Sequence, residues 1–258
     1  MLNEVAYSEE TCLNIFNFYI EWNEKNQNRS MRQVIELLAL LIARTPNQQT
    51  KIAVKTSILQ RSMSIITHQG AQPLVKPAFK ALECLLNKHT VSTQDLIDVY
   101  KNLASSGVSP LVATESIETD AIWDSFFSEV FEWVTLADVS PAAGKFLVTV
   151  FSELRNASHG QKNFASSWQR WIRDGLSKQP EALENVKNYL FPPLFKLDRL
   201  GSLAFLEDLN KQKSVWHVKN QDFDAQSLLQ LAAIEVGKKC GLIEESSMYG
   251  EFLAWVSC

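Results

Sequence analysis

Apolar residues recur along nearly the whole chain at the three- and four-residue spacing of an amphipathic helix. One such stripe contains Val34, Leu37, Leu38, Leu41 and Ile42. Residues at this spacing lie on one side of a helix, where neighbouring helices can cover them. The periodicity therefore predicts an all-α fold in which each helix buries one face.

A β fold is disfavoured by the same sequence. The best candidate strand, Val215-Trp-His-Val218, is too short and isolated to build a sheet. The 258 residues also include only nine glycines and eight prolines, which are few turn-forming residues for a many-stranded β fold.

Capping and turn residues indicate where the helices begin. A first helix is expected over about residues 8–25, where the Ser8 hydroxyl and two acids suit the positive end of a helix. Later starts are expected at Ser30, Asn47, Pro73, Ser92, Asp120, Pro141, Asn163, Pro180, Ser202, Asp224 and Ser246. Ser92 is followed three residues later by an aspartate, which is the spacing of a capping box. Gly201, Gly241 and Phe191-Pro-Pro-Leu194 predict breaks or kinks.

The expected helix starts recur about every 22 residues, so a pair of helices takes about 44, within the range of HEAT and armadillo units. We therefore predict a HEAT/armadillo-like α-solenoid of antiparallel helix pairs, with residues 1–258 forming a single helical-repeat domain. In a variant of this prediction, two halves meet near residues 105–118. An irregular helical domain with the same average helix length is the alternative, because the units share little letter-by-letter similarity.

No pattern of residues indicates catalysis, a cofactor or a metal site. The four histidines lie in different predicted elements, without a second ligand at metal-site spacing. The sequence has neither a phosphate-binding loop nor a Gly-x-Ser-x-Gly nucleophile elbow. Ser158-His159-Gly160 is expected to form a polar turn, because adjacent side chains rarely point at each other. We expect a protein that is not an enzyme and infer no small-molecule substrate; an unrecognised helical hydrolase is the least favoured alternative.

The sequence also indicates the compartment. Cys12, Cys84, Cys240 and Cys258 are far apart in sequence and predict free thiols in a reducing environment. The longest apolar run, residues 34–43, has about half the length of a membrane span and contains Glu36. The N-terminus lacks the pattern of a secretory signal. We therefore expect a soluble intracellular protein without a membrane partner.

Charge is distributed unevenly. Residues 44–88 contain seven lysines and arginines but one acid, Glu83, whereas the acids of residues 115–138 have no basic residue among them. Within the basic stretch, Lys51 and Lys55, and likewise Lys76 and Lys80, stand four residues apart and so share a helix face. We predict an RNA or acidic-partner surface formed by Lys51, Lys55, Arg61, Lys76 and Lys80. The alternative is that these residues form ordinary solvated faces.

Two aromatic clusters are expected to belong to the core. The first, over Trp123, Phe126, Phe127 and Phe131, predicts a helix covered on two sides. In the second, Trp168 and Trp171 flank Arg170 and could stack on a nucleic-acid base. Their three-residue spacing places both indoles on one side of a helix, which favours core packing.

The N-terminal helices resemble a known family. A helix rich in aromatic residues with Trp22 precedes a polar turn, and two further segments follow, one rich in leucine over residues 34–43 and one rich in Pro, Ala and Leu over residues 74–86. This order resembles the N-terminal region of the nucleolar pre-ribosome-associated family over about residues 14–100. Members of that family are large α-solenoid scaffolds for early 60S ribosomal particles.

The resemblance implies a non-catalytic scaffold in assembly of the large ribosomal subunit precursor. Its partners would be proteins of a larger assembly together with pre-ribosomal RNA, and its location the nucleus or nucleolus. The alternative function is a general protein–protein interaction adaptor, or a transport-type HEAT-repeat protein, with no RNA role. For this alternative a cytoplasmic location stays open.

Overall fold

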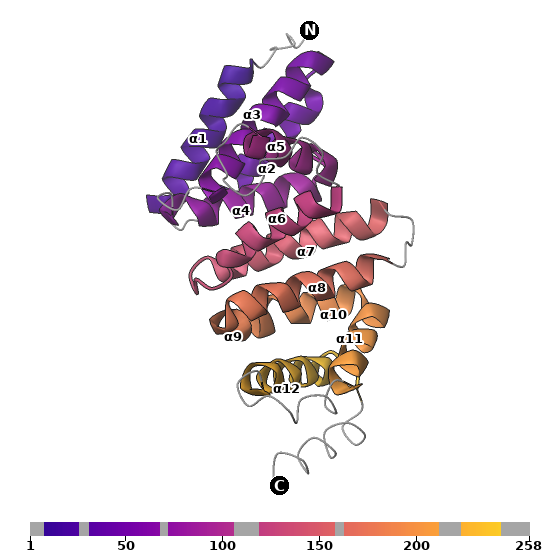
Figure 1. Cartoon of the computed structure of the whole chain (residues 1–258). Coiled ribbons are helices and arrows are strands. Elements are labelled where there is room, and N and C mark those ends of the chain that lie inside the picture. The colour runs from indigo at the N-terminus through magenta and orange to yellow at the C-terminus, as the bar shows by residue number, and fades with distance from the viewer. Residues whose placement is uncertain are drawn as a thin grey trace. The chain divides into compact units, whose positions relative to one another are not determined.

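The computed structural model describes residues 8–25, 31–67, 72–105, 119–157, 163–211 and 223–243, and Figure 1 shows their helices. All regular elements within these ranges are helical, so the predicted all-α class is confirmed for this part of the chain. The candidate strand at residues 215–218 and the start at Ser246 lie outside the described residues.

The chain divides into two compact units, Met1–Trp133 and Val134–Cys258. Residues 106–118 lie outside the described residues, so a meeting of two halves at that place stays a prediction. None of the described helices is long and apolar enough to cross a lipid bilayer.

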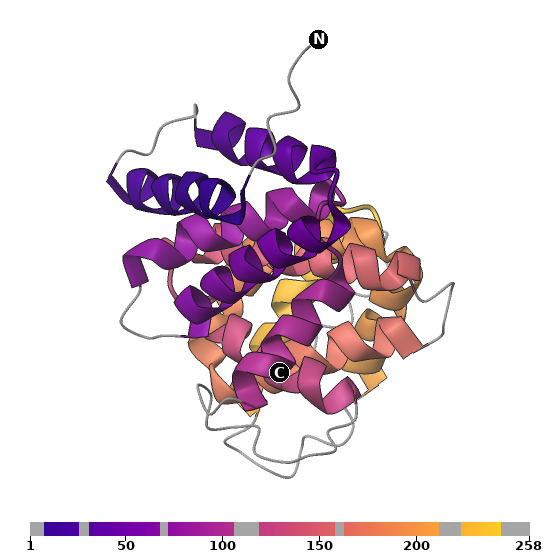
Figure 2. The same cartoon turned by 90° about the horizontal axis from the view of Figure 1, so that it is seen from above.

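Six helices lie within the described residues of the first unit. They are α1 (Glu9–Lys25), α2 (Met31–Arg44), α3 (Gln48–Thr67), α4 (Gln72–Asn87), α5 (Thr93–Ser105) and α6 (Thr119–Glu132). α1 packs against α2, α3 and α4, while α3 also contacts α4, α5 and α6. In the view from above, α1 and α2 lie side by side (Figure 2). The five residues between them make the pair antiparallel.

Local capping begins several of these helices where the sequence predicts. The Asn47 side-chain oxygen accepts a hydrogen bond of 2.9 Å from the Gln49 backbone N–H at the start of α3. At the start of α5, the Ser92 hydroxyl accepts from the Asp95 backbone N–H at 3.1 Å, and the Asp95 carboxylate accepts from the Ser92 N–H at 2.8 Å. This reciprocal pair is the predicted capping box, and it satisfies two N–H groups that the helix itself leaves unbonded.

Aromatic side chains of α6 are buried in the first unit. Trp123 and Phe127 stack with ring centres 5.6 Å apart, and Phe126 meets Tyr100 of α5 edge to face at 5.4 Å. The burial predicted for this helix is confirmed, since its aromatic residues expose 8% or less of their surface. Trp133, just after α6, donates a hydrogen bond of 2.9 Å from its indole N–H to the Ile66 carbonyl oxygen of α3.

The second unit is formed by α7 (Ser140–Ala157), α8 (Asn163–Lys178), a helical run over Pro180–Leu197, α11 (Arg199–Lys211) and α12 (Phe223–Lys239). The run consists of η2 (Pro180–Ala182), α9 (Leu183–Asn185), η3 (Val186–Leu190) and α10 (Phe191–Leu197). It contacts α7 and α12, and α8 contacts α11. Its buried residues include Val186, Leu190, Phe191, Leu194 and Phe195.

The kink expected at Phe191-Pro-Pro-Leu194 takes the form of a π-helical turn, η3. Pro192 and Pro193 have no N–H, so they cannot bond to the carbonyl groups four residues earlier. The Phe191 N–H instead donates to the Val186 carbonyl oxygen, five residues back. The helix thus continues through two prolines by widening the turn that precedes them.

Gly144 of α7 lets that helix approach the widened turn closely. A Cβ at this position would lie 3.2 Å from the Tyr189 carbonyl oxygen, which belongs to a backbone that cannot move aside easily. A larger residue would therefore push α7 and η3 apart by a few tenths of an ångström, so the observed packing distance favours glycine.

The expected break at Gly201 and start at Ser202 are wrong. α11 begins at Arg199, because Asp198 caps it: the Asp198 carboxylate accepts a hydrogen bond of 3.1 Å from the Gly201 N–H. Gly201 therefore lies in the first turn. The break at Gly241 is confirmed, since its φ of +63° ends α12 and the Leu242 N–H donates to the Gly237 carbonyl oxygen at 2.8 Å.

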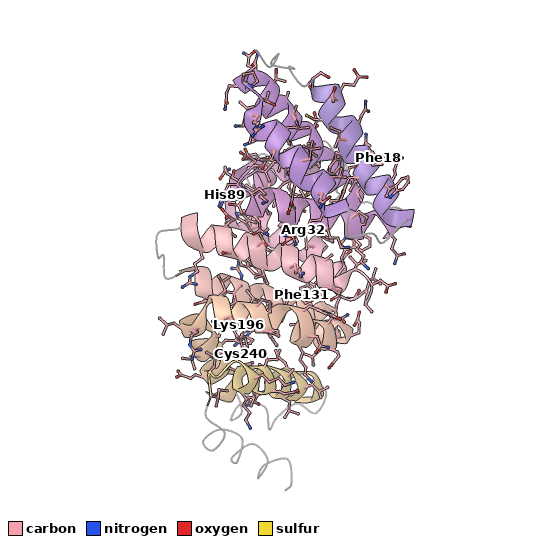
Figure 3. The ribbon with its side chains drawn as sticks, turned by 180° about the vertical axis from the view of Figure 1, so that it is seen from behind. Phe18, Arg32, His89, Phe131, Lys196 and Cys240 are labelled. Atoms are coloured by element: carbon pink, nitrogen blue, oxygen red, sulfur yellow. The ribbon has the colours of Figure 1, made fainter. Side chains whose placement is uncertain are left out.

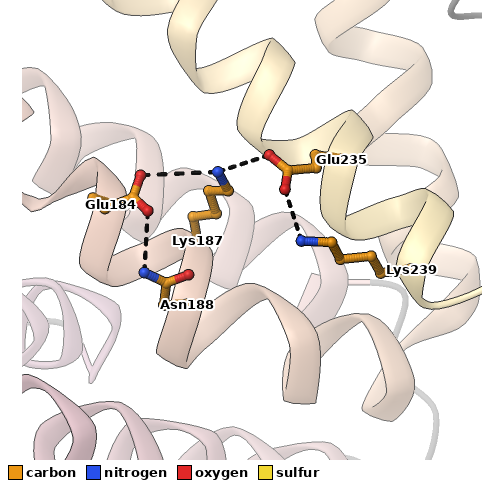
Figure 4. A network of polar contacts seen from close by, with 5 residues as sticks. All are labelled: Glu184, Lys187, Asn188, Glu235 and Lys239. Carbon is orange, nitrogen blue, oxygen red and sulfur yellow. Dashed lines mark hydrogen bonds and ion pairs between the residues drawn. The ribbon is translucent and has the colours of Figure 1, made fainter.

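Ion pairs join α12 to the central run of the second unit (Figure 4). Lys187 of η3 lies 2.7 Å from the Glu235 carboxylate of α12, which also pairs with Lys239 at 2.7 Å. Hydrogen bonds from Lys187 and Lys239 lower the pKa of Glu235 below its usual value of 4.5. These exposed ion pairs add a contribution to the stability of the second unit that depends on pH, beside the contribution from burial of α12.

Phe127→Ala should lower the free energy of unfolding by roughly 3–5 kcal/mol, because it leaves a cavity among packed aromatic rings. Chemical denaturation measures the change. The control is Phe18→Ala, which truncates a half-exposed phenylalanine of the same unit. A loss at Phe127 no larger than that at Phe18 would contradict the buried placement of α6.

Glu235→Gln should flatten the pH dependence of stability in acid. A carboxyl group with a lowered pKa in the folded state contributes stability above its unfolded pKa, and this contribution is lost as the pH falls through the folded pKa. The native protein should therefore lose stability relative to the variant between roughly pH 5 and pH 3. Thermal unfolding across this range tests it, with exposed Glu181→Gln as a control that should follow the native curve.

Candidate functional site

Within the residues that the structure describes, no group of three or more His, Cys, Asp and Glu side chains could hold a metal ion. Cys12, Cys84 and Cys240 are free thiols. Burial raises the pKa of Cys12 and of Cys84, which disfavours the reactive thiolate form. Ser158-His159-Gly160 and Cys258 lie outside the described residues.

The five candidate basic residues lie on two helices of the first unit that pack against each other. Lys51, Lys55 and Arg61 belong to α3, and Lys76 and Lys80 belong to α4. Arg61 follows Lys55 by six residues and therefore points to another side of α3. The candidates thus share one helix pair, and their binding of RNA or an acidic partner stays a prediction.

Lys55 already has an acidic neighbour. Its ammonium group lies 3.5 Å from the carboxylate of Asp95, the residue that completes the capping box of α5. This pair offsets part of the positive charge on α3. The second pair of lysines lies on α4, where Lys80 is exposed and Lys76 is half-buried, and it provides a separate target for a test of nucleic-acid binding.

The indole pair of α8 belongs to the core of the second unit. Trp168 is fully buried and donates a hydrogen bond of 2.9 Å to the Asp198 carboxylate. Trp171 stacks on Phe151 of α7 with ring centres 5.7 Å apart. Arg173 lies 5.2 Å from the Phe205 ring centre and pairs with Asp208. Core packing, which the spacing favours, is confirmed for Trp168, while Trp171 is half-buried at the edge of the core.

A surface that we did not predict from the sequence lies between α1 and α2. The two helices border a hollow of about 450 Å³ that is open to solvent. It is lined by Thr11, Asn14, Ile15, Phe18, Val34 and Leu37. Phe18 exposes 49% of its surface and Leu37 exposes 51%. Trp22, with its ring centre 5.5 Å from that of Phe18, is 44% exposed, and Leu40 is 53% exposed. We call this surface the α1–α2 groove; Figure 3 shows Phe18 on the outer side of α1.

The placement of Leu37 corrects an expectation. The sequence places it in the buried stripe of its helix, together with Leu38, Leu41 and Ile42, which are indeed buried. The apolar arc of α2 is wider than the surface that neighbouring helices cover, so Leu37 and Leu40 are left at its edge. An arc this wide is the signal in the sequence that could have indicated the groove.

No protein-family model, curated protein or solved structure matches this chain.

Lys76→Glu combined with Lys80→Glu should weaken binding to structured RNA and flatten its dependence on salt. Loss of two phosphate contacts lowers the slope of log affinity against log salt by roughly 1.4 to 1.8. Lys145→Glu with Lys196→Glu, an equal charge change at exposed sites of the second unit, is the control. An unchanged slope, or no RNA binding by the native chain at low salt, would exclude an RNA surface here.

Proposed function

We propose that this protein is a non-catalytic α-solenoid scaffold that binds a protein partner through the α1–α2 groove. The observation that carries the proposal is the exposure of Phe18, Trp22, Leu37 and Leu40 on one pair of helices. Clustered apolar side chains of this size on a protein surface characterise interaction sites, and aromatic residues are enriched in them.

The order of helix contacts supports the solenoid arrangement within each unit. In the first unit, α1 contacts α3 and α3 contacts α5, while α2 contacts α4. Stacked antiparallel hairpins produce this alternation, because equivalent helices of successive hairpins lie next to one another. In the second unit the run Pro180–Leu197 lies between α7 and α12, and α8 contacts α11, which is the same alternation.

The resemblance described above extends the proposal to assembly of the large ribosomal subunit. In that setting the groove would hold an assembly factor, while the α4 lysines would contact ribosomal precursor RNA. An adaptor without an RNA role uses the same groove and differs only in the partners that it holds. The groove and the ribosomal assignment are therefore tested separately.

Leu37→Asp should remove the partners that co-purify with the tagged native chain, because a buried, unpaired carboxylate is unfavourable in an apolar interface. Leu200→Asp is the matched control, since Leu200 is 82% exposed on the second unit. The control should retain every partner. Identical partner sets for the two variants would show that the groove is not the binding site.

The same purification tests the ribosomal assignment. Large-subunit assembly factors and ribosomal precursor RNA should be enriched with the native chain, and the assembly factor held by the groove should be lost with Leu37→Asp. Enrichment of other proteins without this RNA would favour the general adaptor and exclude the ribosomal role.

A further inference from the structure

The exposed side of α1 carries two parallel stripes. Thr11, Ile15 and Phe18 line the α1–α2 groove, and the exposed Trp22 continues their mainly apolar row. Glu10, Asn14, Asn17 and Glu21 form a polar stripe beside it. Both sets follow the same four, three and four residue spacing, so the stripes run side by side along the helix. Asn14 itself lines the hollow, which places the polar stripe at the rim of the groove.

The rim on α1 is acidic at both ends. Glu10 and Glu21 are exposed, and neither has an ion-pair partner among the side chains that the structure describes. Eleven residues separate them, which corresponds to roughly 16 Å along the helix axis. Their charges are thus available to a ligand that lies along the groove.

The opposite rim, on α2, is different. At the corresponding spacing it carries Gln33, Leu37, Leu40 and Arg44, so its middle is apolar and its charge lies at the end of the helix. Arg32 and Glu36 stand in the neighbouring row of α2 and pair with each other at 3.1 Å, so their charges offset one another. The groove therefore has an acidic edge along α1 and an apolar edge along α2.

We propose that the α1–α2 groove binds an amphipathic helix of a partner protein that carries lysine or arginine along one edge. This inference rests on the proposed function, because it specifies the partner of the same groove. An apolar stripe fills the hollow by the helix-in-groove mode, and basic residues about eleven positions apart on the partner meet Glu10 and Glu21. RNA is disfavoured as the occupant, because both glutamates repel phosphate.

Two designed helical peptides of 18 residues test this partner. They share one leucine stripe and differ along one edge, which carries four lysines in the first peptide and four glutamates in the second. The native chain should bind the lysine peptide roughly tenfold more tightly at low salt, because attractive pairs replace repulsive ones at two exposed sites. The preference should shrink as salt screens these charges. Fluorescence anisotropy of labelled peptides measures both affinities.

Charge reversal in the protein provides the decisive comparison. Glu10→Lys with Glu21→Lys should reverse the preference, so that the glutamate peptide binds more tightly. Glu181→Lys with Glu207→Lys makes the same change in net charge at exposed sites of the second unit and should leave the preference intact. Leu37→Asp should weaken both peptides, and Leu40→Asp provides a second variant at the apolar edge on α2. Circular dichroism checks that each variant is folded.

Equal affinity for the two peptides, or a preference that both double variants change alike, would overturn the inference. So would self-association of the native chain that Leu37→Asp abolishes, because the occupant would then be a second copy. If co-purified partners are still lost with Leu37→Asp in these cases, the groove remains a protein-binding site and only its specificity for a basic helix is wrong. If Leu37→Asp keeps every partner, the proposed function itself fails.

Discussion

Burial of an apolar stripe of each helix against neighbouring helices is the interaction on which the rest of this structure depends. The described helices have 20 residues or fewer, and isolated helices of that length are marginal in water. Their stability therefore comes from packing, as at Leu38, Ile58 and Leu82, which are completely buried in the first unit. The capping groups set where helices begin, and the ion pairs join helices that this burial already holds together.

The same requirement explains the unusual positions. Gly144 stands where α7 must approach η3, and the widened turn of η3 precedes two prolines that cannot donate hydrogen bonds. The Trp168 indole, which lies in the core, is paired with the Asp198 carboxylate. The α1–α2 groove is the exception, because none of the described helices covers the large apolar side chains there. A partner that places a helix against these side chains would remove them from water.

Charged residues have two different roles in this protein, and the sequence alone does not distinguish them. Lys55 and Lys187 reach acids on other helices, where their contribution is to join elements. Glu10 and Glu21 have no such partner among the described side chains and lie along an apolar hollow. Charges of the second kind can select a ligand, because the energy of pairing them is realised only on binding.

The sequence by itself determined the helical class and most helix starts, because periodicity and capping depend on residues only a few positions apart. The capping box at Ser92 and the break at Gly241 are of this kind. The cap of α11 is also local, since Asp198 and Gly201 stand three residues apart, although the glycine at Gly201 misplaced the predicted start. Tertiary structure alone decided the exposure of Leu37 and the pairing of Lys55 with Asp95. An apolar stripe indicates that neighbouring helices can cover one side of a helix. The number and placement of those neighbours decide how much of the stripe is buried. The groove, and with it the candidate site, therefore follows from which helices meet, a property of contacts between residues distant in sequence.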